Sequence, residues 1–400
     1  MDDFRSDPRF SDINGSGFAV AVLDTGIDRD HSFFGPDGNG DGVADRIVFN
    51  HDFADDDSDA SDVDGHGSNV SSISASEDST YTGMAPAADV VALKVFRDSG
   101  GGTFGMVEDA LQWVVSNGPT YNIAAVNMSL GDGANYTSDR TLYGLGDELS
   151  ALASLNIIVT SASGNEFYSS GSSQGVAYPS ADPNSFSIGA VYDADTGSWS
   201  YGSGAKAYST GPDRIAPFSQ RDDALTTVFA PGAVITGANE SGGTTNLHGT
   251  SQASPHIAGI AVLAQQLSVR EHGDRLSAEE LADLLRATGV SINDGDDEDD
   301  NVTNTGLDGP RVDVLALAEA IEAGTADAHV VDLGAGDVVS NVDFGNTDAN
   351  APDPDPMTWQ TVPETTGPAS VAMTATTASD PEGSGVEYFF EETSGNPGGD

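Results

Sequence analysis

The chain has 400 residues, of which 64 are acidic and only 14 are basic, so its formal net charge is −50. Such a charge repels a phosphate backbone, which excludes nucleic acid as an expected partner. Hydrophobic residues make up 38% of the chain and cysteine is absent, so we expect a folded protein without disulfides or thiol catalysis. No apolar run approaches the roughly 20 residues of a membrane span. We expect a monomer adapted to a salty exterior, where counterions screen its acidic surface.

Apolar runs and helical patterns alternate through most of the chain. Runs that are typical of buried parallel strands lie at residues 18–23, 90–96, 123–128 and 157–160. Apolar residues at helical spacing lie at residues 107–114 and 142–155. This alternation predicts an α/β fold of three layers, in which helices flank a mostly parallel sheet.

Three polar residues come just after predicted strands: Asp24, Ser129 and Asn165. The carboxyl ends of parallel strands meet at one edge of a sheet, which is where ligands bind in such folds. We therefore expect these side chains to lie near one another although they are far apart in sequence.

Near residue 324 the helical patterns end and patterns of short strands begin. Helical patterns at 278–287 and 312–323 end a large predicted domain, residues 1–323, and Ser277 with Glu280 forms a capping box before the first of them. Residues 324–350 are predicted to be a connector with strands at 330–333 and 338–344. A charged, proline-rich linker at 351–356 opens residues 351–400, which we interpret as the start of a truncated immunoglobulin-like or fibronectin-like β domain, with strands at 371–374 and 386–390.

A candidate nucleophile lies in the stretch from His248 to Gly259. Ser251 stands where a Gly-Thr loop meets the small apolar run 257–263, which we interpret as a buried helix. Ser251 would then lie at the helix N-terminus, where free N–H groups favour a developing negative charge. Pro255 lacks the N–H that would otherwise bond to the carbonyl of Ser251.

A serine hydroxyl needs a histidine to take its proton and a carboxylate to orient that histidine. Of the seven histidines, His66 lies between glycines that let the backbone approach closely. His248 and His256 are nearer to Ser251 in sequence, but we expect structural roles for both. Asp24 directly follows a buried strand, a position that is costly for a carboxylate unless it is hydrogen-bonded or functional.

These segments resemble the motifs of the subtilisin-like serine proteases. Residues 249–256 are similar to the nucleophile motif G-T-S-x-A-S-P-H, residues 24–26 to D-T-G, and residues 66–68 to H-G-T. The resemblance covers residues 9–323 and implies a subtilisin-like fold with Asp24, His66 and Ser251 as the catalytic triad. The chain departs from the family at Gln252, where Met is usual, and at residues 69–72, where H-V-A-G often follows.

The resemblance also implies how an oxyanion and a substrate would be held. Asn165, in a segment similar to A-G-N, would donate its side-chain NH₂ beside the backbone N–H of Ser251. Ala177 matches a position near the base of the first specificity pocket, which implies a broad, apolar preference. An edge that pairs with an extended peptide is implied for Ser129, Leu130 and Gly131.

An acidic loop is a candidate calcium site. Its oxygen-bearing positions alternate as in half of an EF-hand loop, with Gly42 at the sharp turn. The residues expected to hold a structural calcium ion are Asp37, Asn39, Asp41, Val43 and Asp45. The twelfth position is Val48 rather than Glu, so a solvated acidic loop is the alternative.

The sequence is therefore identified as a member of the subtilisin-like serine proteases. We expect a secreted or cell-surface, calcium-dependent serine endopeptidase that acts on proteins or peptides. We expect that the sequence is a fragment of a longer chain, because it opens without the pattern of a signal peptide. The alternative function is a non-catalytic, calcium-dependent adhesion module built on a protease fold.

Overall fold

The computed structural model describes residues 1–324, 359–367 and 370–375. The chain divides into two compact units, Met1–Ala323 and Gly324–Asp400. None of the helices in the described residues combines the length and the apolar character needed to cross a bilayer.

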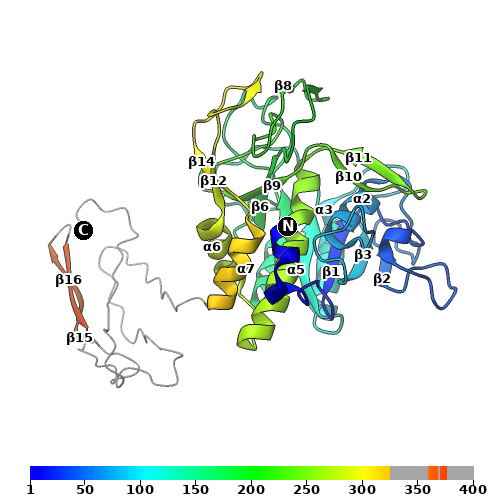
Figure 1. Cartoon of the computed structure of the whole chain (residues 1–400), viewed down its shortest axis with the longest axis horizontal. Coiled ribbons are helices and arrows are strands. Elements are labelled where there is room, and N and C mark those ends of the chain that lie inside the picture. The colour runs from blue at the N-terminus through cyan, green and yellow to red at the C-terminus, as the bar shows by residue number, and fades with distance from the viewer. Residues whose placement is uncertain (325–358, 368–369, 376–400) are drawn as a thin grey trace. The chain divides into compact units, whose positions relative to one another are not determined.

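A nine-stranded sheet lies at the centre of the first unit (Figure 1). Its strands are β1 (Ala19–Asp24), β2 (Ile47–Asp52), β3 (Asp89–Lys94), β4 (Ile123–Met128), β5 (Ile158–Ala162), β6 (Phe186–Val191), β9 (Thr226–Pro231), β12 (Val290–Asn293) and β14 (Asp308–Arg311). They are ordered β12-β14-β9-β6-β5-β4-β1-β3-β2. Every neighbouring pair is parallel except β12 with β14.

Helices cover both faces of this sheet. They are α1 (Asp2–Ser6), α2 (His66–Ala75), α3 (Phe104–Asn117), α4 (Gly146–Ser154), α5 (Thr250–His272), α6 (Ala278–Thr288) and α7 (Val314–Ala323), with short 3-10 turns η1 (Pro8–Phe10) and η2 (Ser32–Phe34). The smaller strands are β7 (Trp199–Ser200), β8 (Lys206–Ser209) and β13 (Asp299–Asp300), which form one small sheet, and the hairpin of β10 (Ile235–Ala238) with β11 (Thr244–Leu247).

Strand β1 shows why the central strands are apolar on both sides. Its side chains alternate between two hydrophobic cores, because successive residues of a strand point to opposite faces. Val20 and Val22 belong to the core that contains the buried side chains of α5 and α7, whereas Ala21 and Leu23 belong to the core beneath α3 and α4. A sheet that is covered on both faces requires this continuous apolar run.

The strand order reverses direction at β1, which pairs with β3 on one side and β4 on the other. The chain adds β2 and β3 on one side of β1, and then crosses to add β4, β5, β6 and β9 on the other. Such a switch point is where open α/β sheets place their sites, at the carboxyl ends of the strands. Asp24 ends β1, Ser129 follows β4, and Asn165 lies three residues past β5.

The predicted α/β class, with three layers and a mostly parallel sheet, is confirmed. The helix predicted from residue 142 begins later, at Gly146, because Tyr143 and Gly144 have positive φ angles of 57° and 86°. Strands β2, β6, β9, β12 and β14 of this sheet were not predicted. Small and polar residues interrupt the apolar run in Phe-Ser-Ile-Gly-Ala-Val of β6, and β9 begins with two threonines and ends in proline.

In the second unit, β15 (Trp359–Gly367) and β16 (Ser370–Ala375) form an antiparallel pair. The strand predicted at 371–374 falls within β16. The strands predicted at 330–333, 338–344 and 386–390, and the linker at 351–356, lie outside the described residues. The truncated β domain at 351–400 stays a prediction.

Candidate active site

Asp24 is the last residue of β1, and its side chain is 1% exposed. One carboxylate oxygen, Oδ1, accepts a hydrogen bond from the backbone N–H of Thr25 at 2.7 Å. The same oxygen lies 2.7 Å from Nδ1 of His66. Oδ2 is buried and has no hydrogen-bond partner in the part of the chain that the structure describes. The strand end thus presents a buried carboxylate to a single imidazole.

His66 begins α2, after Gly65 in a left-handed conformation with φ of 95°. Because Nδ1 faces the Asp24 carboxylate, this nitrogen carries the proton, and Nε2 is the basic position of the neutral ring. Burial acts to lower the pKa of His66. The charge and hydrogen bond of Asp24, followed by the charges of Asp64 and Asp62, outweigh burial and raise the pKa.

Ser251 is the second residue of α5, so it lies at the helix N-terminus, as predicted. Its hydroxyl donates to the carbonyl of Ser129 at 3.3 Å, and the hydroxyl of Ser129 donates to the carbonyl of Ser251 at 2.6 Å. Proline at 255 leaves that carbonyl without its helical partner, so the Ser129 hydroxyl satisfies it instead.

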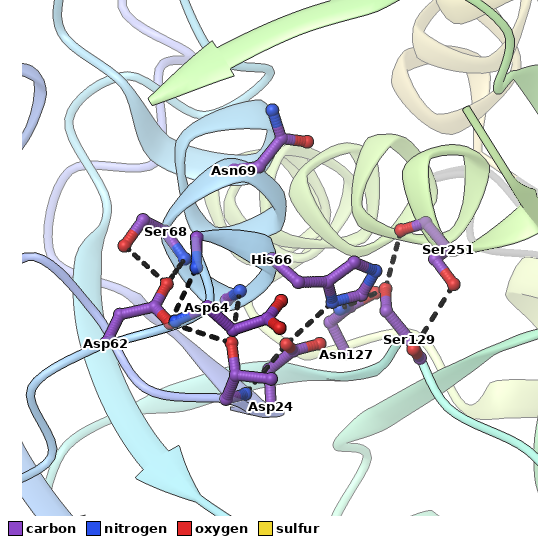
Figure 2. Close-up of polar contacts among 12 residues, drawn as sticks. Asp24, Asp62, Asp64, His66, Ser68, Asn69, Asn127, Ser129 and Ser251 are labelled. Carbon is purple, nitrogen blue, oxygen red and sulfur yellow. Dashed lines mark hydrogen bonds and ion pairs between the residues drawn. The ribbon is translucent and has the colours of Figure 1, made fainter. Parts of the chain in front are cut away.

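Ser129 connects Ser251 to the other two residues. In the β1–β4 pair Leu23 lies opposite Met128, so the next residues, Asp24 and Ser129, are neighbours across the sheet. Figure 2 shows the imidazole of His66 between Asp24 and Ser251. Within the described residues the Ser251 hydroxyl bonds to Ser129 rather than to His66. Such loose contacts are common in substrate-free sites and do not argue against a nucleophile and base pair.

Asn165 lies against the loop that precedes Ser251. Its Oδ1 accepts hydrogen bonds from the backbone N–H of Thr250 at 2.9 Å and from the Thr250 hydroxyl at 3.1 Å. A backbone N–H can only donate, so the contact assigns the oxygen end of the amide. The NH₂ end has no hydrogen-bond partner among the residues that the structure describes. A side chain at Gly249 would place Cβ 3.3 Å from Nδ2 of Asn165, so the small residue permits this approach.

The predicted substrate-binding residues are connected by two contacts, Ser129 with Ser251 and Gly131 with Ala177. Ser129 and Leu130 follow β4, and both are largely buried. A Cβ on Gly131 or on Gly164 would lie 3.2 Å from Cβ of Ala177, so these three positions meet closely. Within the described residues, no backbone hydrogen bond occupies the N–H or carbonyl of Leu130 or Gly131.

The acidic loop at 37–45 is held by its own backbone. Asp37 accepts the N–H groups of residues 40–42, Asp41 accepts that of Val43, Asn39 accepts that of Asp41, and Asp45 accepts that of Gly38. Among residues 1–324, no group of three or more acidic or histidine side chains is placed to hold a metal ion.

The two other histidines near Ser251 in sequence do not contact Asp24. The ring of His248 lies against Trp199 and Tyr201, with centroids 5.0 and 5.3 Å apart. Nδ1 of His256 lies 2.8 Å from the carbonyl of Gln252, one turn back along α5. Both contacts are structural.

Sequence reasoning missed two buried polar residues of the site. Asn127 is fully buried in β4 and donates from Nδ2 to the Ser129 hydroxyl at 2.9 Å, while its Oδ1 accepts from Ser254 at 2.8 Å. A polar residue inside an otherwise apolar strand was the available signal. The second is Asp62, four residues before His66. Many aspartates surround it in the sequence, so it does not stand out from them.

Comparisons with known proteins show what this chain is similar to. A model of the subtilase family, peptidase S8, matches residues 15–310. Subtilisin amylosacchariticus of Bacillus subtilis subsp. amylosacchariticus is 31% identical over 251 residues, which cover 62% of this chain and 55% of that protein. Subtilisin of Bacillus pumilus is 31% identical over 251 residues, covering 62% of this chain and 77% of that protein.

The solved structures include a similar fold. A cold-adapted subtilisin-like serine proteinase matches with a TM-score of 0.53 and 27% identity, covering 69% of this chain and 83% of that one. The chain spans 55% of the length of subtilisin amylosacchariticus, so its matched part is one segment of such a relative.

Proposed function

Because the chain belongs to the subtilase family, we propose that it is a serine endopeptidase in which Ser251 is the nucleophile, His66 the general base and acid, and Asp24 the residue that orients His66. The observation that carries this proposal is the 2.7 Å contact between Asp24 and His66 at the sheet switch point. Ser251 is hydrogen-bonded to Ser129, the neighbour of Asp24 across the sheet.

The reaction would begin when substrate binding turns the Ser251 hydroxyl from Ser129 toward Nε2 of His66. His66 takes the hydroxyl proton as the oxygen attacks the scissile carbonyl, and buried Asp24 stabilises the imidazolium that forms. The free NH₂ of Asn165 and the backbone N–H of Ser251 would receive the oxyanion. His66 then protonates the leaving amine, and water attacks the acyl-enzyme by the same route.

The substrate would be an extended peptide that pairs with residues 129–131, because the backbone groups of Leu130 and Gly131 are free of partners in the described structure. Ala177, which is 1% exposed, meets Gly131 and Gly164 at the base of the predicted pocket. These residues carry no charge, which supports a broad preference for apolar side chains.

A fluorophosphonate probe is expected to label this protein on Ser251, because the reagent reports a serine activated by a base. Mass spectrometry of the digested adduct would locate the modified residue, and Ser251→Ala provides the unlabelled control. A folded protein that is not labelled would favour the non-catalytic adhesion module instead.

The acidic surface is expected to make folding depend on salt. With a net charge of −50, self-repulsion opposes the compact state, and counterions screen it over about 10 Å at 0.1 M salt. We expect the thermal midpoint to rise steeply between 10 mM and 1 M NaCl, as measured by circular dichroism. A midpoint that is unchanged across this range would contradict salt adaptation.

We also propose that the loop at 37–45 binds a structural calcium ion and that the protein is secreted. Asp37, Asn39, Asp41 and Asp45 offer the oxygen ligands that Ca²⁺ prefers, with the backbone at Val43, but in this structure the side chains bond to loop N–H groups. The salt titration therefore includes an arm with CaCl₂ and one with EGTA at constant ionic strength. A higher midpoint with calcium, lost in Asp41→Asn, would support the site; equal midpoints would remove it.

A further inference from the structure

Asp62 is a buried carboxylate that the proposed mechanism does not use. It lies four residues before His66 and is 6% exposed. Its Oδ1 accepts from the Thr25 hydroxyl at 2.9 Å and from the N–H groups of Asp64 and Gly65 at 3.0 Å each. Its Oδ2 accepts from the N–H of Ser68 at 2.8 Å and from the Ser68 hydroxyl at 2.7 Å. Figure 2 shows these contacts beside His66.

These hydrogen bonds join the two chain segments that carry Asp24 and His66. Thr25 directly follows Asp24, and its hydroxyl oxygen also accepts the N–H of Gly67, which directly follows His66, at 2.8 Å. The two turns pack so closely that a Cβ on Gly67 would lie 2.1 Å from the carbonyl oxygen of Gly26. Asp62 therefore hydrogen-bonds to both of these turns, at a contact where the backbones are too close to admit a side chain.

The charge on Asp62 is stabilised where it lies. Burial alone would raise the pKa of Asp62, but hydrogen bonds from Gly65 and Ser68 outweigh burial and hold the pKa below its usual value. The carboxylate also lies at the first turn of α2, where it complements the positive end of the helix dipole. It is therefore ionised at neutral pH and accepts from five donors at once.

We propose that Asp62 is a positioning residue, which holds the Asp24–Thr25 turn and the first turn of α2 in the register that the Asp24–His66 hydrogen bond requires. This inference rests on the proposed peptidase function. Asp62 would act through His66 and Asp24 and would not touch the substrate. Small displacements of a catalytic group can cost about 100-fold in rate, so loss of the Asp62 hydrogen bonds is expected to lower turnover.

A matched control lies two residues away. Asp64 carries the same charge on the same loop, but it is exposed, and its carboxylate makes no hydrogen bond or ion pair within the described residues. Other charged groups around His66 include Asp24 of β1 and Glu240 of the β10–β11 turn, which lies against Gly65. Lys94 of β3 donates to the Thr25 carbonyl. From Thr250 to Val269, helix α5 carries one titratable side chain, His256.

The test compares Asp62→Ala, Asp62→Asn and Asp64→Asn by the pH profiles of kcat and kcat/KM on a fluorogenic peptide. Activity needs neutral His66, so it is present above the His66 pKa and is lost as pH falls through it. Removing either negative charge should move this acid limb to lower pH, because both charges favour the imidazolium. Only the Asp62 variants should also lose plateau kcat, by about 10- to 100-fold in Asp62→Ala, with KM within about threefold.

A second readout does not depend on catalysis. In Ser251→Ala protein, the His66 proton shared with Asp24 should give a downfield NMR signal, assigned by its loss in His66→Gln. We expect the signal to persist in Asp64→Asn and to shift or broaden in both Asp62 variants. If the wild type cleaves peptides but the Asp62 variants match Asp64→Asn in kcat and in this signal, the inference is wrong and the peptidase proposal stands. If the wild type does not cleave peptides, the NMR signal alone tests whether Asp62 positions His66. If Asp62→Ala does not fold, Asp62→Asn provides the test.

Discussion

Replacing Ser251 with alanine is expected to lower kcat for peptide hydrolysis by about a million-fold, the magnitude known for loss of the nucleophile in subtilisin itself. The hydroxyl is the atom that becomes acylated, and no neighbouring group can replace it: Ser129 donates its own hydroxyl to the Ser251 carbonyl. Stopped and steady-state assays with a fluorogenic peptide would measure the loss, at the salt concentration that keeps the protein folded.

Ser268 provides the matched control for this substitution. It lies in the same helix, 17 residues further along, so at 1.5 Å per residue it is roughly 25 Å from Ser251. Its hydroxyl donates to the carbonyl of Asp274, outside the site. Ser268→Ala should retain near wild-type kcat. Residual hydrolysis above about 1% in Ser251→Ala, with no copurified protease, would mean that another residue is the nucleophile.

Replacing Asp294 with alanine is expected to destabilise the first unit by about 3–5 kcal/mol, the usual cost of leaving a buried charge without its partner. Arg221 and Asp294 form a two-pronged pair, with Nε–Oδ2 at 2.9 Å and Nη2–Oδ1 at 2.7 Å, and their side chains are only 5% and 2% exposed. The guanidinium also lies 3.5 Å from the ring centroid of Phe167. Without Asp294, it would remain buried and unpaired.

Chemical unfolding at fixed, high salt would measure this loss. The exposed pair Arg286–Asp283, at 3.4 Å, offers a control, because Asp283→Ala should cost less than about 1 kcal/mol. Replacing Arg221 and Asp294 together by Met and Leu should recover part of the loss, since neither charge of the pair then remains buried. The recovery is partial because Thr305 loses the carboxylate that accepts its N–H and its hydroxyl. Equal effects of Asp294→Ala and Asp283→Ala would contradict the buried pair.

The ion pair also bears on the site. The residue before Arg221, Gln220, donates its backbone N–H to the carbonyl of Gly164 at 2.9 Å, directly before Asn165. Its side chain donates to Asn135 at 2.6 Å and to the Ala134 carbonyl at 2.9 Å, on the segment that follows Gly131. Movement of Arg221 would thus reach both the proposed oxyanion residue and the substrate-binding edge.

The sequence was most informative where chemistry and local structure coincide. Asp24 ends an apolar strand, and Ser251 lies in the first turn of a buried helix, four residues before Pro255. Each position leaves a local pattern that can be read without coordinates. The alternation of strands and helices then placed the strand ends at one edge of the sheet, as the structure shows. The fold class and the helix at the nucleophile were predictable for these reasons.

Long-range pairing left no such pattern. Ser129 and Ser251 are 122 residues apart, and Arg221 and Asp294 are 73 apart, so only the folded chain reveals that they meet. Asp62 was concealed for a different reason. In a chain with 64 acidic residues, a structural aspartate looks like its solvated neighbours until its burial and its donors are known.

The central claim is that Asp24, His66, Asn165 and Ser251 act on one carbonyl group. A crystal structure of the phosphonate adduct would test this most directly, since the phosphonyl group imitates the tetrahedral intermediate. We predict a covalent bond to Oγ of Ser251, a phosphonyl oxygen within hydrogen-bond distance of Nδ2 of Asn165, and Nε2 of His66 beside the bonded oxygen. An adduct on another residue, or a phosphonyl oxygen turned away from Asn165, would contradict the account.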